Sequence, residues 1–339
     1  MIPATMPAIH YVSPFVPAEW IAAHGFTPVR LSPHQAGPGP LLGPLEGLCP
    51  YARAFANVVA GAPPAGVVAG ASPAAVIVAT TCDQMRRASE FLARDGLPPL
   101  FTLNVPATWQ TSGAQRMYLD ELKRLGRFLV RLGGAAPADA RLAEVMREWD
   151  TQREAARAAR SRLTGRAYAE ALAELHRTGR FPVPPASAPL LLQGARLALV
   201  GGPLLREDLW LYDLIEDSGG RVVLDATETG ERALPPPFDR RGLSDAPLLE
   251  LAAAYFGRLP DAFRRPNSQL YAWLKQEFSA RSVRGVLFVR EVWCDLWHAE
   301  QERLREWCGL PFAELDFGGG GDTRGRAETR VQTLLGMLP

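Results

Sequence analysis

The chain has 339 residues, of which 47% are hydrophobic and 22% charged, and its formal net charge is +1. This size allows two domains or one large one, and the composition is ordinary for a globular protein. A charge so near zero gives no electrostatic argument for nucleic acid or a membrane surface as partner. The N-terminal MIPATMPAIHYV lacks a secretory signal pattern. No uncharged apolar run approaches the roughly 18–20 residues of a membrane span, so we expect a cytoplasmic protein.

The first half of the chain is expected to contain two strand–helix–strand units. Residues 8–31 form the first unit, and a helix over 50–60 follows directly after Cys49. Residues 75–103 form the second unit, with its helix over 84–94. Its first strand is a short apolar run, as is typical of strands buried on both faces of a parallel sheet.

A helical segment is predicted between the two halves. Helices are expected over 116–132, 137–161 and 165–177, and no strand pattern interrupts them. The middle helix is rich in Ala, Arg and Glu, which fits an exposed helix with ion pairs between residues four apart. The proline-rich stretch 181–189 indicates a linker and the preferred domain boundary.

The second half repeats the order of the first. Residues 196–232 predict a strand, a glycine–proline turn, a helix over 205–217 and another strand. A helix over 267–280 leads into a second unit at 285–317, and 327–338 forms a closing helix.

Strand–helix–strand units imply parallel strands joined by right-handed crossovers. We therefore predict an α/β protein with two doubly wound parallel-sheet domains, flavodoxin-like or Rossmann-like, joined by a helical connector. The expected boundaries define an N-terminal domain, a connector with its linker, and a C-terminal domain, at residues 1–112, 113–189 and 190–339.

One short unit occurs twice, at 75–103 and 285–317. Each copy is an apolar run, then Cys-Asp, an amphipathic segment, Gly-Leu-Pro and another apolar run. Cys82 precedes the glycine of its copy by 14 positions, and Cys294 precedes that of the other by 15. Ligands gather at the carboxyl ends of parallel strands. We therefore expect the two cysteines to face each other across a cleft and to hold a metal centre.

The four cysteines, without an export signal, suggest thiols or metal ligands rather than disulfides. Cys49 follows the second strand and can reach the same rim as Cys82 and Cys294. Cys308 is expected on the same helix as Cys294, and 14 residues at about 1.5 Å each place it roughly 20 Å away, outside a compact site. Three thiolates on one cubane leave one iron without a protein ligand, and catalysis needs such an open position.

Other interpretations of these residues stay open. Free cysteines are among the most buried residues, so all of them can belong to the core. His298, four residues after Cys294 on the same helical face, would complete a tetrahedral Cys₃His zinc site with the three cysteines, although a solvated histidine is the commoner case. His24, at the end of a predicted helix, is interpreted as a charge partner of the helix C-terminus.

Nucleotide-binding motifs are absent from the sequence. Neither lysine, Lys123 or Lys275, belongs to a G-x-x-x-x-G-K-[ST] loop, so the chain has no P-loop to hydrolyse ATP. No G-x-G-x-x-G opens a helix. Gly201-Gly202-Pro203 follows a predicted strand and is interpreted either as a simple tight turn or as a close approach of the backbone to a ligand.

Segments along most of the chain resemble the 2-hydroxyacyl-CoA dehydratase D-component family, which includes benzoyl-CoA reductase subunits. Each segment is short, and their order over the whole length is what makes the resemblance specific. In chain order they are VPAEW with GFTPVR at 16–30, LCPYARA at 48–54, TTCDQMRR at 80–87, Gly201-Gly202-Pro203 with DATETGER at 225–232, and WCDLW at 293–297 with ETRVQTLL at 328–335.

The resemblance implies a lyase subunit that holds a 4Fe–4S cluster on Cys49, Cys82 and Cys294, with one iron not bound by cysteine. It implies a homologous sister subunit or a homodimer, and a separate ATP-dependent iron–sulfur activator that supplies one electron. The implied reaction is dehydration of a 2-hydroxyacyl-CoA to the enoyl-CoA through a ketyl radical. A benzoyl-CoA-reductase-like or electron-relay subunit is the first alternative, and a zinc or metal-free α/β binding protein is the second.

Overall fold

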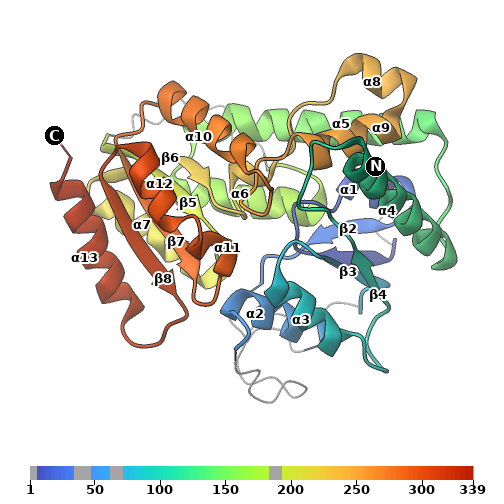
Figure 1. The fold of residues 1–339 in the computed structure, drawn as a ribbon, viewed down its shortest axis with the longest axis horizontal. Helices are drawn as coiled ribbons and strands as arrows, with labels where there is room; N and C mark the ends of the chain where they lie inside the picture. The colour runs from blue at the N-terminus through green and yellow to red at the C-terminus, as the bar shows by residue number, and fades with distance from the viewer. Residues whose placement is uncertain (1–5, 34–46, 62–71, 183–192, 339) are drawn as a thin grey trace.

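The computed structural model describes residues 6–33, 47–61, 72–182 and 193–338 of the chain. These residues form two four-stranded sheets, each entirely parallel (Figure 1). The strands of the first sheet are β1 (Ala8–Tyr11), β2 (Thr27–Arg30), β3 (Ala75–Ala79) and β4 (Leu100–Leu103). The strands of the second are β5 (Ala195–Gly201), β6 (Gly220–Ala226), β7 (Gly285–Glu291) and β8 (Phe312–Phe317).

The two sheets share one strand order. It is β2-β1-β3-β4 in the first sheet and β6-β5-β7-β8 in the second. The winding direction therefore reverses between β1 and β3, and again between β5 and β7. In doubly wound sheets ligands bind at this switch point, outside the carboxyl ends of the strands. The prediction of an α/β protein with two doubly wound parallel sheets is confirmed.

Helices cover both faces of the first sheet. They are α1 (Ala18–Ala23), α2 (Pro50–Val59), α3 (Asp83–Leu92) and α4 (Ser112–Arg131). α1 and α4 pack on one face, and α2 and α3 pack on the other. Along β3 the side chain of Ile77 contacts the first layer, whereas Val76 and Val78 contact the second. Every residue of this strand is thus buried, which is why its sequence is apolar throughout.

The second sheet is covered in the same way. Its helical elements are η2 (Arg206–Leu209), α7 (Trp210–Asp217), η3 (Glu231–Ala233), α10 (Ser268–Ala280), α11 (Asp295–His298), α12 (Gln301–Cys308) and α13 (Thr323–Gly336). α7 and α13 pack on one face of the sheet, and α10 to α12 pack on the other. Each half is therefore a three-layer α/β/α unit.

The predicted helical segment between the sheets is present beyond α4. It consists of α5 (Asp139–Ala159), η1 (Arg160–Arg162) and α6 (Gly165–Thr178). The predicted linker at 181–189 lies almost entirely outside the described residues. Phe181, its first residue, is buried and donates its backbone N–H to Gln152 Oε1 at 2.9 Å.

A segment late in the sequence packs on the first half. It contains α8 (Arg240–Asp245), α9 (Pro247–Ala252) and a π-helical turn at Ala253–Gly257, and it lies against α4 and α5 (Figure 1). Apolar side chains of residues 234–259, Phe256 among them, belong to the core beneath the first sheet. A buried ion pair joins Glu19 of α1 to Arg153 of α5, and Tyr255 Oη donates to the same glutamate at 2.7 Å. The two halves of the sequence are therefore interlocked through this layer.

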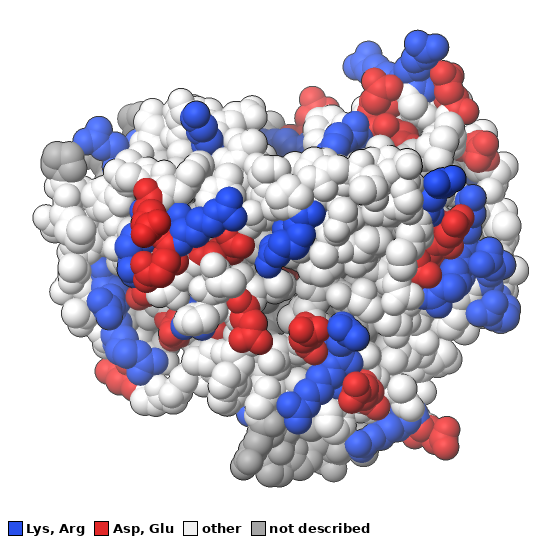
Figure 2. All heavy atoms as spheres, in the orientation of Figure 1, with Lys and Arg blue, Asp and Glu red and all other residues white. Residues whose placement is uncertain are grey.

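No helix of the described part of the chain is long and apolar enough to cross a membrane. On the face in Figure 2, basic and acidic side chains are interspersed. This distribution agrees with the net charge of +1.

His24 closes α1 as a buried neutral group, and not as the charge partner predicted from the sequence. Its side chain is 2% exposed, its ring packs edge-on against Trp20, and its Nδ1 lies 2.7 Å from the Trp20 carbonyl oxygen, so Nδ1 carries the proton. Burial lowers the pKa of His24 below its ordinary value. Since a charged imidazole would lose its hydration here, the folded chain keeps the ring neutral.

This histidine is expected to make stability depend on pH. Its pKa is lower in the folded chain than in the unfolded chain, so below about pH 6.5 the unfolded chain binds the proton first. The free energy of unfolding should therefore fall as the pH falls, by at most about 1.4 kcal/mol per pH unit from this group. Urea unfolding of His24→Gln between about pH 7.5 and about pH 5.5 should give a shallower slope than the natural chain. Equal slopes would contradict this prediction.

Candidate metal centre

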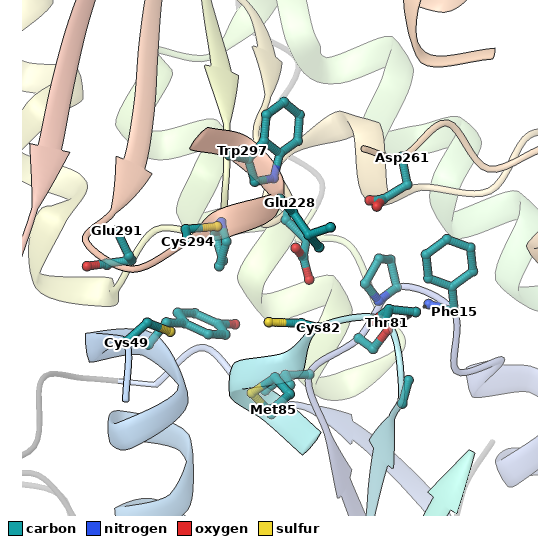
Figure 3. A pocket seen from close by; sticks show the side chains of 17 residues that line it. Phe15, Cys49, Thr81, Cys82, Met85, Glu228, Asp261, Glu291, Cys294 and Trp297 are labelled. Atoms are coloured by element: carbon teal, nitrogen blue, oxygen red, sulfur yellow. Dashed lines mark hydrogen bonds between the residues drawn. The ribbon is translucent and has the colours of Figure 1, made fainter. Parts of the chain in front are cut away.

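A cavity lies between the two halves, at the carboxyl ends of their strands (Figure 3). The first half lines it with the segments after β1 and β3 and with the start of α2. The second half lines it with the segments after β5, β6 and β7. The cavity thus adjoins the switch points of both sheets, as doubly wound folds predict. One residue from each of these segments illustrates the lining: Phe15, Cys82, Cys49, Pro203, Glu228 and Cys294.

The three cysteines predicted as ligands all line this cavity, each at the start of a helix. Cys49 is the N-cap of α2, Cys82 that of α3 and Cys294 that of α11. The carbonyl of each cysteine accepts the backbone N–H four residues later, at 3.0, 3.0 and 2.9 Å respectively. An N-cap residue is extended while its carbonyl already belongs to the helix. The structure therefore brings together three thiols that lie far apart in the sequence.

Burial dominates the acidity of these thiols. It raises the pKa of Cys82 to about 11 and that of Cys294 to about 12, and it raises the pKa of Cys49 further. Backbone N–H groups at the helix starts act in the opposite direction; Ala52 donates to Cys49 Sγ at 3.4 Å. Neighbouring negative charges raise the pKa again, with Cys82 and Cys294 acting on Cys49, and Glu228 acting on the other two.

These properties fit a metal or cluster held by sulfur. Three thiolates this close repel one another, and a bound cation removes that penalty and displaces the protons. Soft sulfur donors suit zinc or iron–sulfur clusters, and they do not suit magnesium or calcium. The helix-start N–H groups favour negative charge at the sulfur atoms. The residues present therefore fit an iron–sulfur cluster.

Cys308 lies outside this site, although the helix predicted to carry it is broken. One continuous helix from Cys294 to Cys308 was wrong, because α11 ends at His298 and α12 begins at Gln301. Glu300 lies between them, 4% exposed, and accepts a hydrogen bond from Tyr271 Oη at 2.7 Å, which draws the chain inward. The Cys308 thiol faces the carbonyl of Leu310 and does not line the cavity.

The alternative Cys₃His zinc site is not assembled. His298 is exposed and does not line the cavity, although it follows Cys294 by one helical turn. Among the residues that the structure describes, no group of three or more His, Cys, Asp or Glu side chains is placed to hold a single metal ion. A cubane binds each thiolate to a different iron, so its ligands need not converge on one point.

Three carboxyl groups that were not predicted from the sequence also line the cavity. They belong to Glu228, Asp261 and Glu291 (Figure 3). Burial, with the charge of Asp261, raises the pKa of Glu228 to about 7, and burial raises the pKa of Glu291 to about 8. Both oxygens of Glu291 are buried without a hydrogen-bond partner in the described structure. Glu291 is the last residue of β7 and Glu228 is two residues beyond β6, so position at the carboxyl end of a strand is the signal that marks them.

A buried arginine joins the segments around the cavity. Arg232 is fully buried and pairs with Asp261, and it also donates to the carbonyl of Gly201 at 3.3 Å. Its guanidinium lies 4.9 Å from the ring centre of Trp297, in the helix that Cys294 begins. Arg232 thereby connects the ends of β5 and β6 to α11, the helix that follows Cys294.

The Gly201-Gly202-Pro203 turn approaches the site closely. Gly202 donates its N–H to the carbonyl of Val289 at 3.0 Å, which holds the end of β5 against β7. A Cβ atom at Gly202 would lie 3.8 Å from Cys294 Sγ, and Pro203 lines the cavity. Of the two interpretations of this turn, the structure favours a close approach to a ligand site.

Comparison with known protein families agrees with this architecture. The family model described as 2-hydroxyglutaryl-CoA dehydratase, D-component, matches residues 14–338. The match includes every strand except β1, the helical segment between the sheets and all three cysteine segments. No curated protein matches the chain significantly. The chain therefore belongs to the 2-hydroxyglutaryl-CoA dehydratase D-component family.

Proposed function

We propose that this chain is the iron–sulfur subunit of a 2-hydroxyacyl-CoA dehydratase-like enzyme, with a 4Fe–4S cluster on Cys49, Cys82 and Cys294. The observation that carries the proposal is the convergence of three thiols, from both halves, on one cavity at the strand ends. The three sulfur donors support iron–sulfur chemistry over a hard cation. Family membership supports a dehydratase component as the context.

The cavity suits a thioester that loses a hydroxyl group. When bound, the cluster would supply one electron and a Lewis-acidic iron for the dehydration of a 2-hydroxyacyl-CoA to the enoyl-CoA. The protein's part is to surround the acyl group with apolar side chains, among them Phe15, Met85 and Trp297, and to exclude bulk water. Arg232 connects the ends of β5 and β6 and the segment of Asp261 beside that pocket.

The proposal includes partners. The family is a component of a dehydratase and acts with other components. We propose that these are a homologous sister subunit, or a second copy of this chain, and a separate ATP-dependent iron–sulfur activator. The sequence supports an external electron source, because it has no P-loop motif with which to couple ATP hydrolysis to electron transfer.

Metal analysis of anaerobically purified and reconstituted protein tests the proposal. We expect about four irons and as many sulfides per chain, the content of one cubane, with a brown colour. Protein that stays metal-free after reconstitution, or that binds zinc in place of iron, would overturn the proposed function.

An electron-relay or benzoyl-CoA-reductase-like subunit is the alternative function. The carboxylate of Glu228, which faces two of the cysteines, favours a relay if it stays bound to the remaining iron when an acyl-CoA is present. Electron paramagnetic resonance of the reduced protein distinguishes these functions. A spectrum that changes on addition of an acyl-CoA supports direct catalysis, whereas a spectrum that no acyl-CoA alters supports a relay.

A further inference from the structure

The strand order that the two sheets share relates four segments around the cavity to one another in pairs. Because both sheets have the same strand order, the segment after β3 corresponds to that after β7, and the segment after β2 corresponds to that after β6. Cys82 and Cys294 occupy the first pair of positions. Cys49 belongs to the segment after β2. The fourth position, after β6, is occupied by Glu228, which is two residues beyond the end of that strand.

The main chain of Glu228 is fixed from both halves. Arg30 Nη2, at the end of β2, donates to the carbonyl of Glu228 at 2.8 Å. The N–H of Glu228 donates to the carbonyl of Gly202 at 3.4 Å. The main chain of Glu228 is therefore held where the two halves meet, and its side chain lines the cavity.

The carboxylate of Glu228 lies between two of the thiols (Figure 3). It projects from the second half toward Cys82, beside Cys294, and its charge raises the pKa of both. Within the described structure it accepts no hydrogen bond, although it is half-buried in a cavity wall. A carboxylate left without donors among thiols resembles a ligand that lacks its metal.

The two other carboxylates of the cavity are engaged differently. Asp261 is paired with the buried guanidinium of Arg232 and accepts the N–H of Phe263 at 2.8 Å. The carboxyl of Glu291 points away from Cys294, toward the turn at Gly318 (Figure 3). Only Glu228, of these three, faces the space between the cysteines.

We propose that Glu228 is the fourth protein ligand of the cluster, binding the iron that the three cysteines leave. This inference rests on the proposed function and gives the open position a specific occupant. A carboxylate is a hard ligand on a soft cluster, so it binds more weakly than a thiolate and a substrate oxygen can replace it. Glu228 would thus protect a bound cluster from loss of its fourth iron while leaving that iron accessible to a substrate oxygen.

Retention of the fourth iron provides a test that needs no substrate. The natural chain, Glu228→Gln and Glu228→Cys are reconstituted with iron and sulfide and treated with a mild oxidant, and conversion of the four-iron to the three-iron cluster is followed by electron paramagnetic resonance. The cluster of Glu228→Gln should lose its fourth iron at least about tenfold faster than that of the natural chain. This factor is comparable to the loss of metal affinity when a group that supports a metal ligand is removed. Glu228→Cys should convert more slowly, because it adds a fourth thiolate. Glu291→Gln removes a carboxylate whose charge also acts on Cys49 and Cys294 but which points away from the space between the cysteines. It measures the effect of charge alone and should convert clearly more slowly than Glu228→Gln.

The possible failures can be told apart. Equal conversion rates in the natural chain, Glu228→Gln and Glu228→Cys would overturn the role of Glu228 and leave the proposed function standing, since iron would still be bound. Equal acceleration by Glu228→Gln and Glu291→Gln would also overturn it, because the effect would then follow from charge alone. A natural chain that binds no iron would overturn both proposals. Circular dichroism of each variant confirms that the chain is folded before oxidation.

Discussion

Replacing Cys82 by serine is expected to abolish binding of the proposed iron–sulfur cluster. Cys82 lies centrally in the site, since its charge acts on Cys49 and it faces Cys294 across the cavity. A serine hydroxyl has nearly the same shape but is a hard, weakly acidic donor that does not replace a thiolate on iron. We expect the affinity of the site for iron to fall more than about a hundredfold. This loss is larger than that caused by removing an outer hydrogen-bond partner of a metal ligand. Iron and sulfide analysis after anaerobic reconstitution measures this.

The matched control is Cys308→Ser. This thiol lies at the end of α12, half-buried beside the Leu310 carbonyl and away from the cavity. The variant should keep the iron content of the natural chain. If Cys82→Ser and Cys308→Ser lost iron equally, the iron would not be held in the cavity between the two halves.

Replacing Gly201 by alanine is expected to destabilise the fold strongly. The residue has a φ of +151°, and a methyl group there would overlap the carbonyl oxygen of Val289 on the neighbouring strand. Backbone cannot move aside as the tip of a side chain can, so β5 and β7 would have to separate at their carboxyl ends. Strain and overpacking together should cost about 3–5 kcal/mol. Thermal unfolding measures the loss, and iron content should fall with it because Cys294 follows β7.

Gly202→Ala is the control for this prediction. A Cβ atom at that position would lie 3.4 Å from Trp297, which is an ordinary van der Waals contact. The neighbouring substitution should therefore change stability by less than about 1 kcal/mol. If both variants unfolded at the same temperature, the close approach of β5 to β7 would not be what requires glycine at position 201.

The repeated Cys-Asp unit predicted much of the fold from local patterns. The strand–helix–strand order could be predicted because its signals are local. Each signal, such as an apolar run, a proline or glycine, or an amphipathic pattern, depends only on residues close together in the sequence. Two parallel units per half then limited the topology to doubly wound sheets. Because such sheets bind ligands at strand ends, the placement of Cys82 and Cys294 at one cavity followed from the same rule.

The remaining features depend on contacts that no local pattern encodes. Glu228 follows an ordinary strand, and only the meeting of the two halves shows that its side chain enters a cavity lined by cysteines. The break after α11 depends on the burial of Glu300 against Tyr271, a contact between residues 29 positions apart. The packing of α9 against α4 likewise joins segments that are remote in sequence. Long-range packing decided each of these points.

The distribution of the cysteines has a consequence for biogenesis. Two of the thiols are translated early, whereas Cys294 emerges only after both the helical layer and most of the second sheet. A nascent chain therefore exposes an incomplete pair of thiols until its second half has folded and docked. A cofactor that binds all three cysteines would therefore find its full set of thiols only in a chain whose two halves have docked.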